Sequence, residues 1–348
     1  MDKKRADRTG MTLAKFFDVW GSLLTFAVLI AVFCLLSGSF RTGTNLINIL
    51  TQSAPTLIIA LGVTFVNMSG ESDLSLGGIV GLSASLFCGF IANGSSPLLA
   101  AAVSIGAGAL FGLLNGILVA CAGLSSFITT ISIMFLTQGL EYAYCGGSSL
   151  WVRDHPVVKV VTASVGPVPV MVILTLVLFA AVYLVMHQTK LGLHIQAVGL
   201  SQDAAKFAGI SVKRIKLVMF VLAGVFYALG GMLNALRSSG SIIYSGQRLL
   251  LPVLAVTYIA KTILGTKRAN IPGILVGALM LTPISTAFTL LSMEFYYWSA
   301  GWSKVCGSRP LRGAKRRRPT HGSCAERPGP WLKEGETFRR KPGSSCVK

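Results

Sequence analysis

The sequence predicts an all-α fold, a polytopic helical membrane protein with about nine transmembrane helices. Composition is the first reason, because 53% of the 348 residues are hydrophobic and only 12% are charged. Soluble globular domains carry about 25% charged residues, so one soluble core does not account for so much apolar sequence. The other two reasons are the succession of apolar segments and the distribution of basic residues between them.

Nine apolar segments follow one another along the chain, and most approach the roughly 20 residues that a helix needs to cross a bilayer. They span residues 17–37, 46–67, 74–92, 97–122, 125–140, 165–186, 217–236, 249–264 and 271–291. Segment 125–140 is interrupted by polar residues, and segment 249–264 contains Pro252 and Lys261. Interrupted segments often line the pathway of a transporter, although a tilted or buried helix explains them equally well.

The basic residues predict a cytoplasmic N-terminus, residues 1–16. The first apolar run is too long for a signal peptide, so we interpret it as a retained transmembrane helix. With the N-terminus inside, the inner segments hold 12 Lys and Arg residues and the outer loops hold 5. Cytoplasmic loops carry the excess of positive charge in membrane proteins, so this orientation is favoured over its reverse.

Composition changes abruptly near Gly301, where the transmembrane domain, residues 17–300, is expected to end. Residues 302–348 hold 13 of the 31 Lys and Arg residues and 3 of the 12 acidic ones, and so contribute +10 of the net charge of +19. We expect the tail, residues 301–348, to be disordered. Nine crossings would leave this basic tail outside, so either one segment is wrong or the ending is truncated or frame-shifted. A genuine tail that binds anionic lipid is the alternative.

Two acidic residues, Glu71 and Asp73, lie between the second and third apolar segments, in the stretch VNMSGESDLSLGGIVGL. An unpaired carboxylate near lipid is costly. Asp73 or Ser72 can cap the third helix, because the N-terminal end of a helix dipole favours an anion. No such role explains Glu71, so we expect Asn at position 73 to be harmful and Gly at position 71 to be tolerated.

The longest inner loop, residues 187–216, is predicted to contain a short amphipathic helix. Ser201 can cap its start, Asp203 and Lys206 suit the two ends of the helix dipole, and Gly209 is a natural stop. Such a helix can fit the groove of a partner protein or lie on the lipid surface.

Two motifs resemble signatures of bacterial sugar ABC-importer permeases of the ribose, xylose and galactose type, in the branched-chain amino acid/ribose permease superfamily. The loop LGLHIQAVGLSQDAAKFAGISVKRIK is similar to their central cytoplasmic loop at Gly192, Ala197, Gly199, Ala204, Ala205, Gly209, Ile210, Val212 and Lys216. The stretch SGESDLSLGG resembles their G-G-I-D-L-S-[VI]-G signature at Gly70, Asp73, Leu74, Ser75 and Gly77. Glu71 and Ser72 depart from the commoner Gly-Ile. The resemblance covers about residues 15–298.

The resemblance implies a multi-pass permease of the bacterial plasma (inner) membrane, with about ten transmembrane segments and a second permease subunit, identical or different. A separate ABC ATPase would dock on a coupling helix formed by Ser201, Gln202, Asp203, Ala204, Ala205, Lys206 and Gly209. A periplasmic or extracellular binding protein would deliver the substrate. No enzymatic step, cofactor or nucleic-acid partner is implied, and the chain contains no Walker A motif. Seven scattered cysteines form no CxxC or zinc pattern, so no metal site is expected.

Polar residues within or beside the apolar segments are the candidates for a translocation pathway. They are Asn67, Glu71, Asp73, Ser75, Asn115, Thr129, Thr130 and Gln138. These groups can bond the hydroxyls of a passing sugar, although Ser and Thr in helices commonly bond their own backbone.

Two other functions compete with this interpretation. A secondary transporter driven by an ion or proton gradient would use intramembrane ionisable residues as a relay, and the candidates are Glu71, Asp73, Glu141, Lys261 and Glu294. An intramembrane enzyme is disfavoured, because Asp73 has no second intramembrane Asp beside it and no His/Ser pair lies inside a segment.

Overall fold

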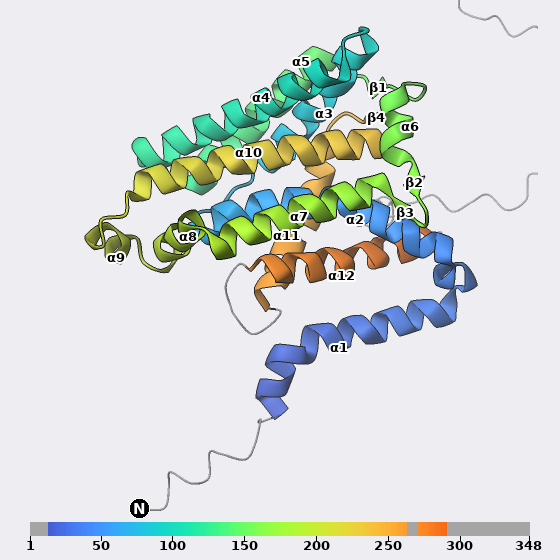
Figure 1. The fold of residues 1–348 in the computed structure, drawn as a ribbon, viewed down its shortest axis with the longest axis horizontal. Coiled ribbons are helices and arrows are strands. Elements are labelled where there is room, and N and C mark those ends of the chain that lie inside the picture. The colour runs from blue at the N-terminus through green and yellow to red at the C-terminus, as the bar shows by residue number, and fades with distance from the viewer. Residues whose placement is uncertain (1–12, 263–269, 291–348) are drawn as a thin grey trace, which may run out of the picture. The chain divides into compact units, whose positions relative to one another are not determined.

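The computed structural model describes residues 13–262 and 270–290, and within them the chain is almost entirely helical (Figure 1). Predictions made for residues 1–12, for Glu294 and for the tail 301–348 lie outside the described residues. The long helices are α1 (Leu13–Leu36), α2 (Gly43–Met68), α3 (Leu76–Ala92), α4 (Pro97–Gly116), α5 (Ser126–Cys145), α7 (Val170–Gln188), α10 (Val212–Arg237), α11 (Ser245–Thr262) and α12 (Ile271–Leu290). Each coincides with one of the nine predicted segments, which confirms a polytopic helical fold.

Short elements connect these helices. They are the 3₁₀ turn η1 (Gly38–Arg41), the π-helical turn η2 (Ile117–Cys121), the helices α6 (Pro156–Thr162), α8 (Lys190–Leu200) and α9 (Gln202–Phe207), and the strands β1 (Leu150–Trp151), β2 (Ser164–Val165), β3 (Val168–Pro169) and β4 (Gly240–Ser241). Strand β1 pairs antiparallel with β4, and β2 pairs antiparallel with β3. The hairpin at residues 164–169 explains why α7 begins at Val170, five residues after the predicted start of its segment.

Four of the long helices are long and apolar enough to cross a membrane by length and composition alone, and these are α2, α4 with η2, α7 and α10. Shorter apolar stretches lie in α1, α3 and α12. Helices α5 and α11, which contain the two interrupted segments, belong to neither group. Their polar residues therefore distinguish them from the rest of the described bundle, as the sequence indicates.

Helix α10 is the central element of the bundle, because it packs along α2, α3 and α4. The contact with α4 depends on glycine, because small residues let two helix backbones approach closely. A Cβ atom on Gly112 would lie 2.4 Å from the carbonyl oxygen of Phe220, and one on Gly224 would lie 2.1 Å from that of Gly108. The two backbones approach so closely that no larger residue fits at these positions.

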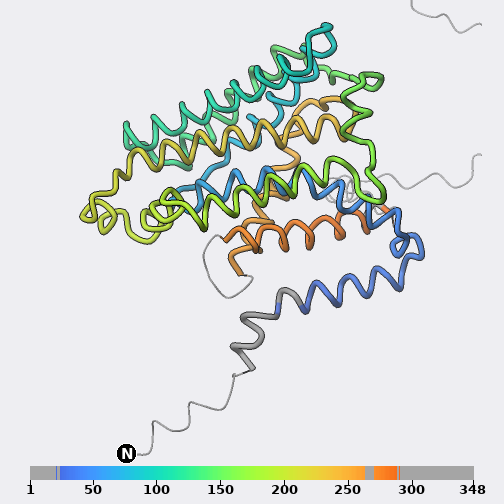
Figure 2. The backbone as a smooth tube through the Cα atoms, viewed as in Figure 1, coloured from blue at the N-terminus to red at the C-terminus, as the bar shows by residue number. Residues whose placement is uncertain are grey.

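The loops gather at two opposite ends of the bundle (Figure 1). At one end, β1 and β4 join the loop after α5 to the loop after α10. At the other end lie α8 and α9, and Figure 2 shows the chain running from α7 through both short helices and back into α10. There the α8 residue Gly199 lies against the carbonyl oxygen of Met68, at the end of α2. The junction between α2 and α3 is thus on the same side of the bundle as the loop of residues 187–216.

Candidate functional site

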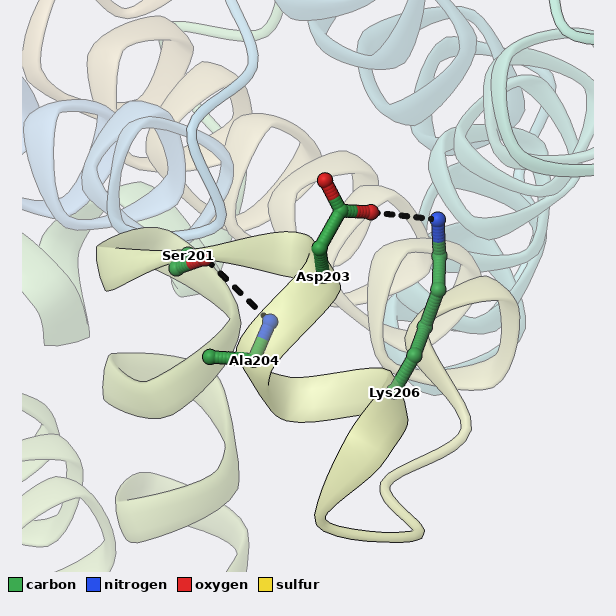
Figure 3. A network of polar contacts seen from close by, with 4 residues as sticks. All are labelled: Ser201, Asp203, Ala204 and Lys206. Atoms are coloured by element: carbon green, nitrogen blue, oxygen red, sulfur yellow. Dashed lines mark hydrogen bonds and ion pairs between the residues drawn. The ribbon is translucent and has the colours of Figure 1, made fainter.

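Helix α9 forms where the sequence predicts the short amphipathic helix. Ser201 is its N-cap, with φ −159° and ψ 115°, and its Oγ accepts a 3.2 Å hydrogen bond from the Ala204 N–H. Asp203 and Lys206 form an ion pair of 3.1 Å one turn apart (Figure 3). Gly209 ends the segment with a φ of +78°, a conformation that glycine adopts without strain.

The surface of α9 is open to a partner. Ala205 packs inward with 3% exposure, whereas the side chain of Phe207 is 93% exposed. Exposed aromatic side chains are frequent anchors in protein–protein interfaces, and Phe207 is the last residue of α9. The Asp203–Lys206 ion pair is exposed and so adds little stability to the fold.

Helix α8, which precedes α9, is absent from the sequence prediction. Thr189 caps its start by accepting a bond of 3.4 Å from the Gly192 N–H. Its inner face carries the buried side chains of Ile195 and Val198. The cap and this helical spacing are the signal that could have revealed α8, whereas the glycines at positions 192 and 199 weaken a helix prediction.

A seven-residue linker, residues 69–75, connects α2 to α3 and carries Asp73. Asp73 is 3% exposed. Its Oδ1 accepts bonds from the Ser75 N–H (2.8 Å) and the Ser75 hydroxyl (2.6 Å), and its Oδ2 accepts one from the Tyr227 hydroxyl (2.9 Å). The N-cap of α3 is Ser75, so the predicted cap at Asp73 or Ser72 is wrong. Asp73 instead bonds the backbone just before the helix and reaches across to α10.

The same linker is bonded to α4 and α5. Asn115 of α4 donates to the Ser75 hydroxyl at 2.9 Å. The backbone N–H of Leu74 donates to the Thr130 hydroxyl at 3.1 Å, and that of Ser72 donates to the Ser126 hydroxyl at 3.3 Å. We call the linker and these partners the polar junction. It contains five predicted pathway residues: Glu71, Asp73, Ser75, Asn115 and Thr130.

Glu71 forms an ion pair with Lys216, in the first turns of α10. The two side chains are 15% and 13% exposed. The prediction that Glu71 has no structural role is therefore wrong. Its partner is 145 residues away in the sequence, and local sequence patterns do not reveal such a distant pairing.

The other predicted pathway residues lie outside the polar junction. Gln138 of α5 donates to the carbonyl oxygen of Gly77, the second residue of α3, at 3.3 Å. Thr129 is buried, and its hydroxyl has no hydrogen-bond partner among the described residues. Asn67 is half-buried near the end of α2, and its side chain makes no hydrogen bond within the part of the chain that the structure describes.

Glu141 is fully buried in a separate cluster nearer the opposite end of the bundle. Its Oε1 accepts bonds from the Ser85 hydroxyl (3.1 Å) and from the Tyr244 N–H (3.2 Å). The Ser85 hydroxyl is also 2.8 Å from that of Ser241. No hydrogen bond or ion pair joins any two of the four described relay candidates, Glu71, Asp73, Glu141 and Lys261.

A cleft of about 210 Å³ lies elsewhere in the bundle. Its lining is apolar and comes from several helices, including Ile58 of α2, Phe87 of α3, Leu178 of α7 and Met232 of α10. None of the predicted pathway residues lines it.

Fold and site together define a class of protein: a polytopic helical membrane protein with an exposed, capped short helix beside a buried polar junction. The chain belongs to the family described as "Branched-chain amino acid transport system / permease component", which matches residues 45–305. It is therefore a transmembrane permease subunit of an ABC importer. The alternative of a secondary transporter is not supported.

Three similar proteins of Escherichia coli (strain K12) are import permeases. The chain is 30% identical to the ribose import permease protein RbsC over 281 residues, which cover 79% of this chain and 87% of the relative. It is 28% identical to the D-allose transport system permease protein AlsC, covering 84% and 90% of the two chains. It is also 28% identical to the galactose/methyl galactoside import permease protein MglC, covering 80% and 88%. No solved structure matches the chain.

Proposed function

We propose that this permease subunit imports a sugar or a similar small polar solute into the cytoplasm. The observation that carries the proposal is α9, a capped and exposed helix located at the motif that resembles the coupling loop of sugar permeases. The names of the similar proteins, which specify ribose, D-allose and galactose, favour the same class of substrate.

Helix α9 is the docking element for a separate ABC ATPase. Phe207 inserts into a groove of that partner, and Asp203 and Lys206 flank it with opposite charges. ATP binding and hydrolysis in the partner then supply the free energy for transport. The permease chain itself performs no covalent chemistry and requires no cofactor.

The subunit lies in the bacterial plasma (inner) membrane with its N-terminus in the cytoplasm. The end of the bundle that carries α8 and α9 faces the cytoplasm in this orientation, because an ATPase partner must reach both α9 and ATP. The end with β1 and β4 then faces a binding protein that delivers the solute. A second permease subunit, identical or different, completes the translocation pathway.

The polar junction is the inner part of that pathway. Its hydroxyl, amide and carboxylate groups match the donors and acceptors of a polyhydroxylated solute. Hydrogen bonds link the side chains of Asp73, Ser75, Asn115 and Tyr227, although Oδ1 of Asn115 is buried without a partner among the described residues. The bonded groups become available to a solute when the helices around the linker separate.

Uptake by proteoliposomes tests the proposal. Vesicles that contain this chain, a matched ATPase and a matched binding protein should accumulate labelled ribose, D-allose or galactose when ATP is enclosed with the ATPase. A protonophore should leave the uptake unchanged. Accumulation without the ATPase that disappears with the proton gradient would refute the proposed mechanism.

A further inference from the structure

We propose that the Glu71–Lys216 ion pair is the joint through which the α8–α9 loop moves the polar junction. Glu71 and Lys216 are thus positioning residues for transport, acting through the linker and not by touching the solute. The inference rests on the proposed function only in its assignment of α9 as the ATPase-docking helix.

The loop and the linker are in direct contact. A Cβ atom on Gly199, at the end of α8, would lie 1.9 Å from the carbonyl oxygen of Met68, directly before the linker. A Cβ atom on Gly70 would lie 3.9 Å from the side-chain nitrogen of Gln202, the first residue of α9. Helix α8, which leads directly into α9, therefore packs against the residue that precedes the linker, and the side chain of Gln202 lies near Gly70.

The Glu71–Lys216 ion pair connects the linker to α10. Its side chains are 13% and 15% exposed, whereas those of the Asp203–Lys206 pair are 82% and 61% exposed. Exposed pairs are weak because water and salt screen them, and loss of one partner from a sheltered pair leaves an uncompensated charge. Glu71 and Lys216 are therefore held together much more firmly than the pair on α9.

Helix α10 holds the linker at two positions. Lys216 bonds Glu71, and Tyr227, 11 residues further along the same helix, bonds Asp73. Both bonds depend on the position of α10 relative to the linker. Because α9 leads into α10 through residues 208–211, a shift of the docking helix changes the first of these bonds before the second.

The linker transmits the shift to the predicted pathway helix α5. The N–H groups of Ser72 and Leu74 donate to hydroxyls of α5. The side chains of the residues between and beside them bond other helices: Glu71 and Asp73 bond α10, and Ser75 bonds α4. A displacement of Glu71 therefore pulls on adjacent residues that hold α5. This alternation makes residues 71–75 a connection between the docking loop and three helices.

Charge reversal in the complete transport complex tests the inference. The single variants Glu71→Lys and Lys216→Glu place like charges together, and the double variant restores an opposite pair. We expect the ATPase subunit to stay bound to each single variant. The number of ATP molecules hydrolysed for each solute imported should rise by about tenfold. The double variant should return this ratio to within about twofold of the original value. Lys213→Glu, which reverses an exposed charge three residues before Lys216 on α10, is the matched control and should leave the ratio unchanged.

Hydrogen exchange of the isolated permease provides a second readout that does not depend on transport. Lys216→Glu should increase exchange at the backbone amides of Ser72 and Leu74, whereas Lys213→Glu should not. Unchanged exchange at these amides would overturn the inference. So would a double variant that hydrolyses as much ATP per solute imported as the single variants do. An unaltered complex that fails to import sugars would count against the proposed function alone, since the exchange result would stand.

Discussion

The hydroxyl of Tyr227 donates a hydrogen bond of 2.9 Å to Oδ2 of Asp73, and both side chains are almost completely buried. The two residues are 154 positions apart in the chain. A carboxylate inside a helical membrane protein needs partners for its lone pairs. Tyr227 and Ser75 supply them, so the cost of burying Asp73 is offset by three hydrogen bonds.

Removing the Tyr227 hydroxyl should weaken the polar junction. Tyr227→Phe leaves Oδ2 of Asp73 without its partner, and an unsatisfied buried acceptor costs about 1–3 kcal/mol. We expect a lower midpoint of thermal unfolding in detergent, followed by size-exclusion chromatography. Tyr258→Phe is the control, because the Tyr258 side chain is 62% exposed on α11. Equal midpoints for the two variants would contradict the importance of this bond.

Asp73→Asn should be more harmful than Glu71→Gln in the same unfolding assay. The Asn amide keeps the size of the side chain but offers one acceptor oxygen, whereas Asp73 accepts bonds on both oxygens. Glu71→Gln removes the charge but keeps an amide oxygen that can still accept a bond from Lys216. The expected loss for Asp73→Asn is about 2 kcal/mol or more. A larger effect of Glu71→Gln would reverse this ranking.

Replacement of Phe207 should weaken ATPase docking without affecting the fold. The side chain is 93% exposed, so Phe207→Ala removes no internal packing. Truncating a central aromatic anchor of a protein interface costs about 2 kcal/mol or more, which corresponds to at least a tenfold rise in the dissociation constant of the ATPase. Surface plasmon resonance on the permease in nanodiscs measures this constant.

The control for this experiment is Leu193→Ala, which truncates an apolar residue of α8 with 63% exposure. It should leave ATPase affinity within about twofold, because scattered exposed apolar residues carry little binding energy. Equal losses for both variants would place the docking surface on α8 as well as α9.

Sequence reasoning succeeded where the structural cause is local. The nine long helices follow from the length and apolarity of their segments, and α9 follows from the cap at Ser201 and the stop at Gly209. It failed where the cause is a distant partner. Nothing near Glu71 indicates Lys216, and nothing near Asp73 indicates Tyr227, because these pairings depend on how α10 packs beside the linker.

Two glycines of α4, six residues apart, should respond in opposite ways to the same substitution. Gly112 faces α10, and an added Cβ would lie 2.4 Å from the carbonyl oxygen of Phe220. Backbone cannot yield as a flexible side chain can, so Gly112→Ala must push α4 and α10 apart. Gly106 is exposed, and a Cβ added there meets nothing within 4 Å.

Gly106→Ala should therefore stabilise the protein slightly, because Ala is favoured over Gly inside a helix by about 1 kcal/mol. Gly112→Ala gains the same propensity but loses the close contact between α4 and α10, and overpacking of this kind costs about 1–3 kcal/mol. Thermal unfolding of both variants in the same detergent gives the comparison. A Gly112→Ala variant as stable as Gly106→Ala would mean that the two helices are not held in the close contact on which the position of Tyr227, and hence the polar junction, depends.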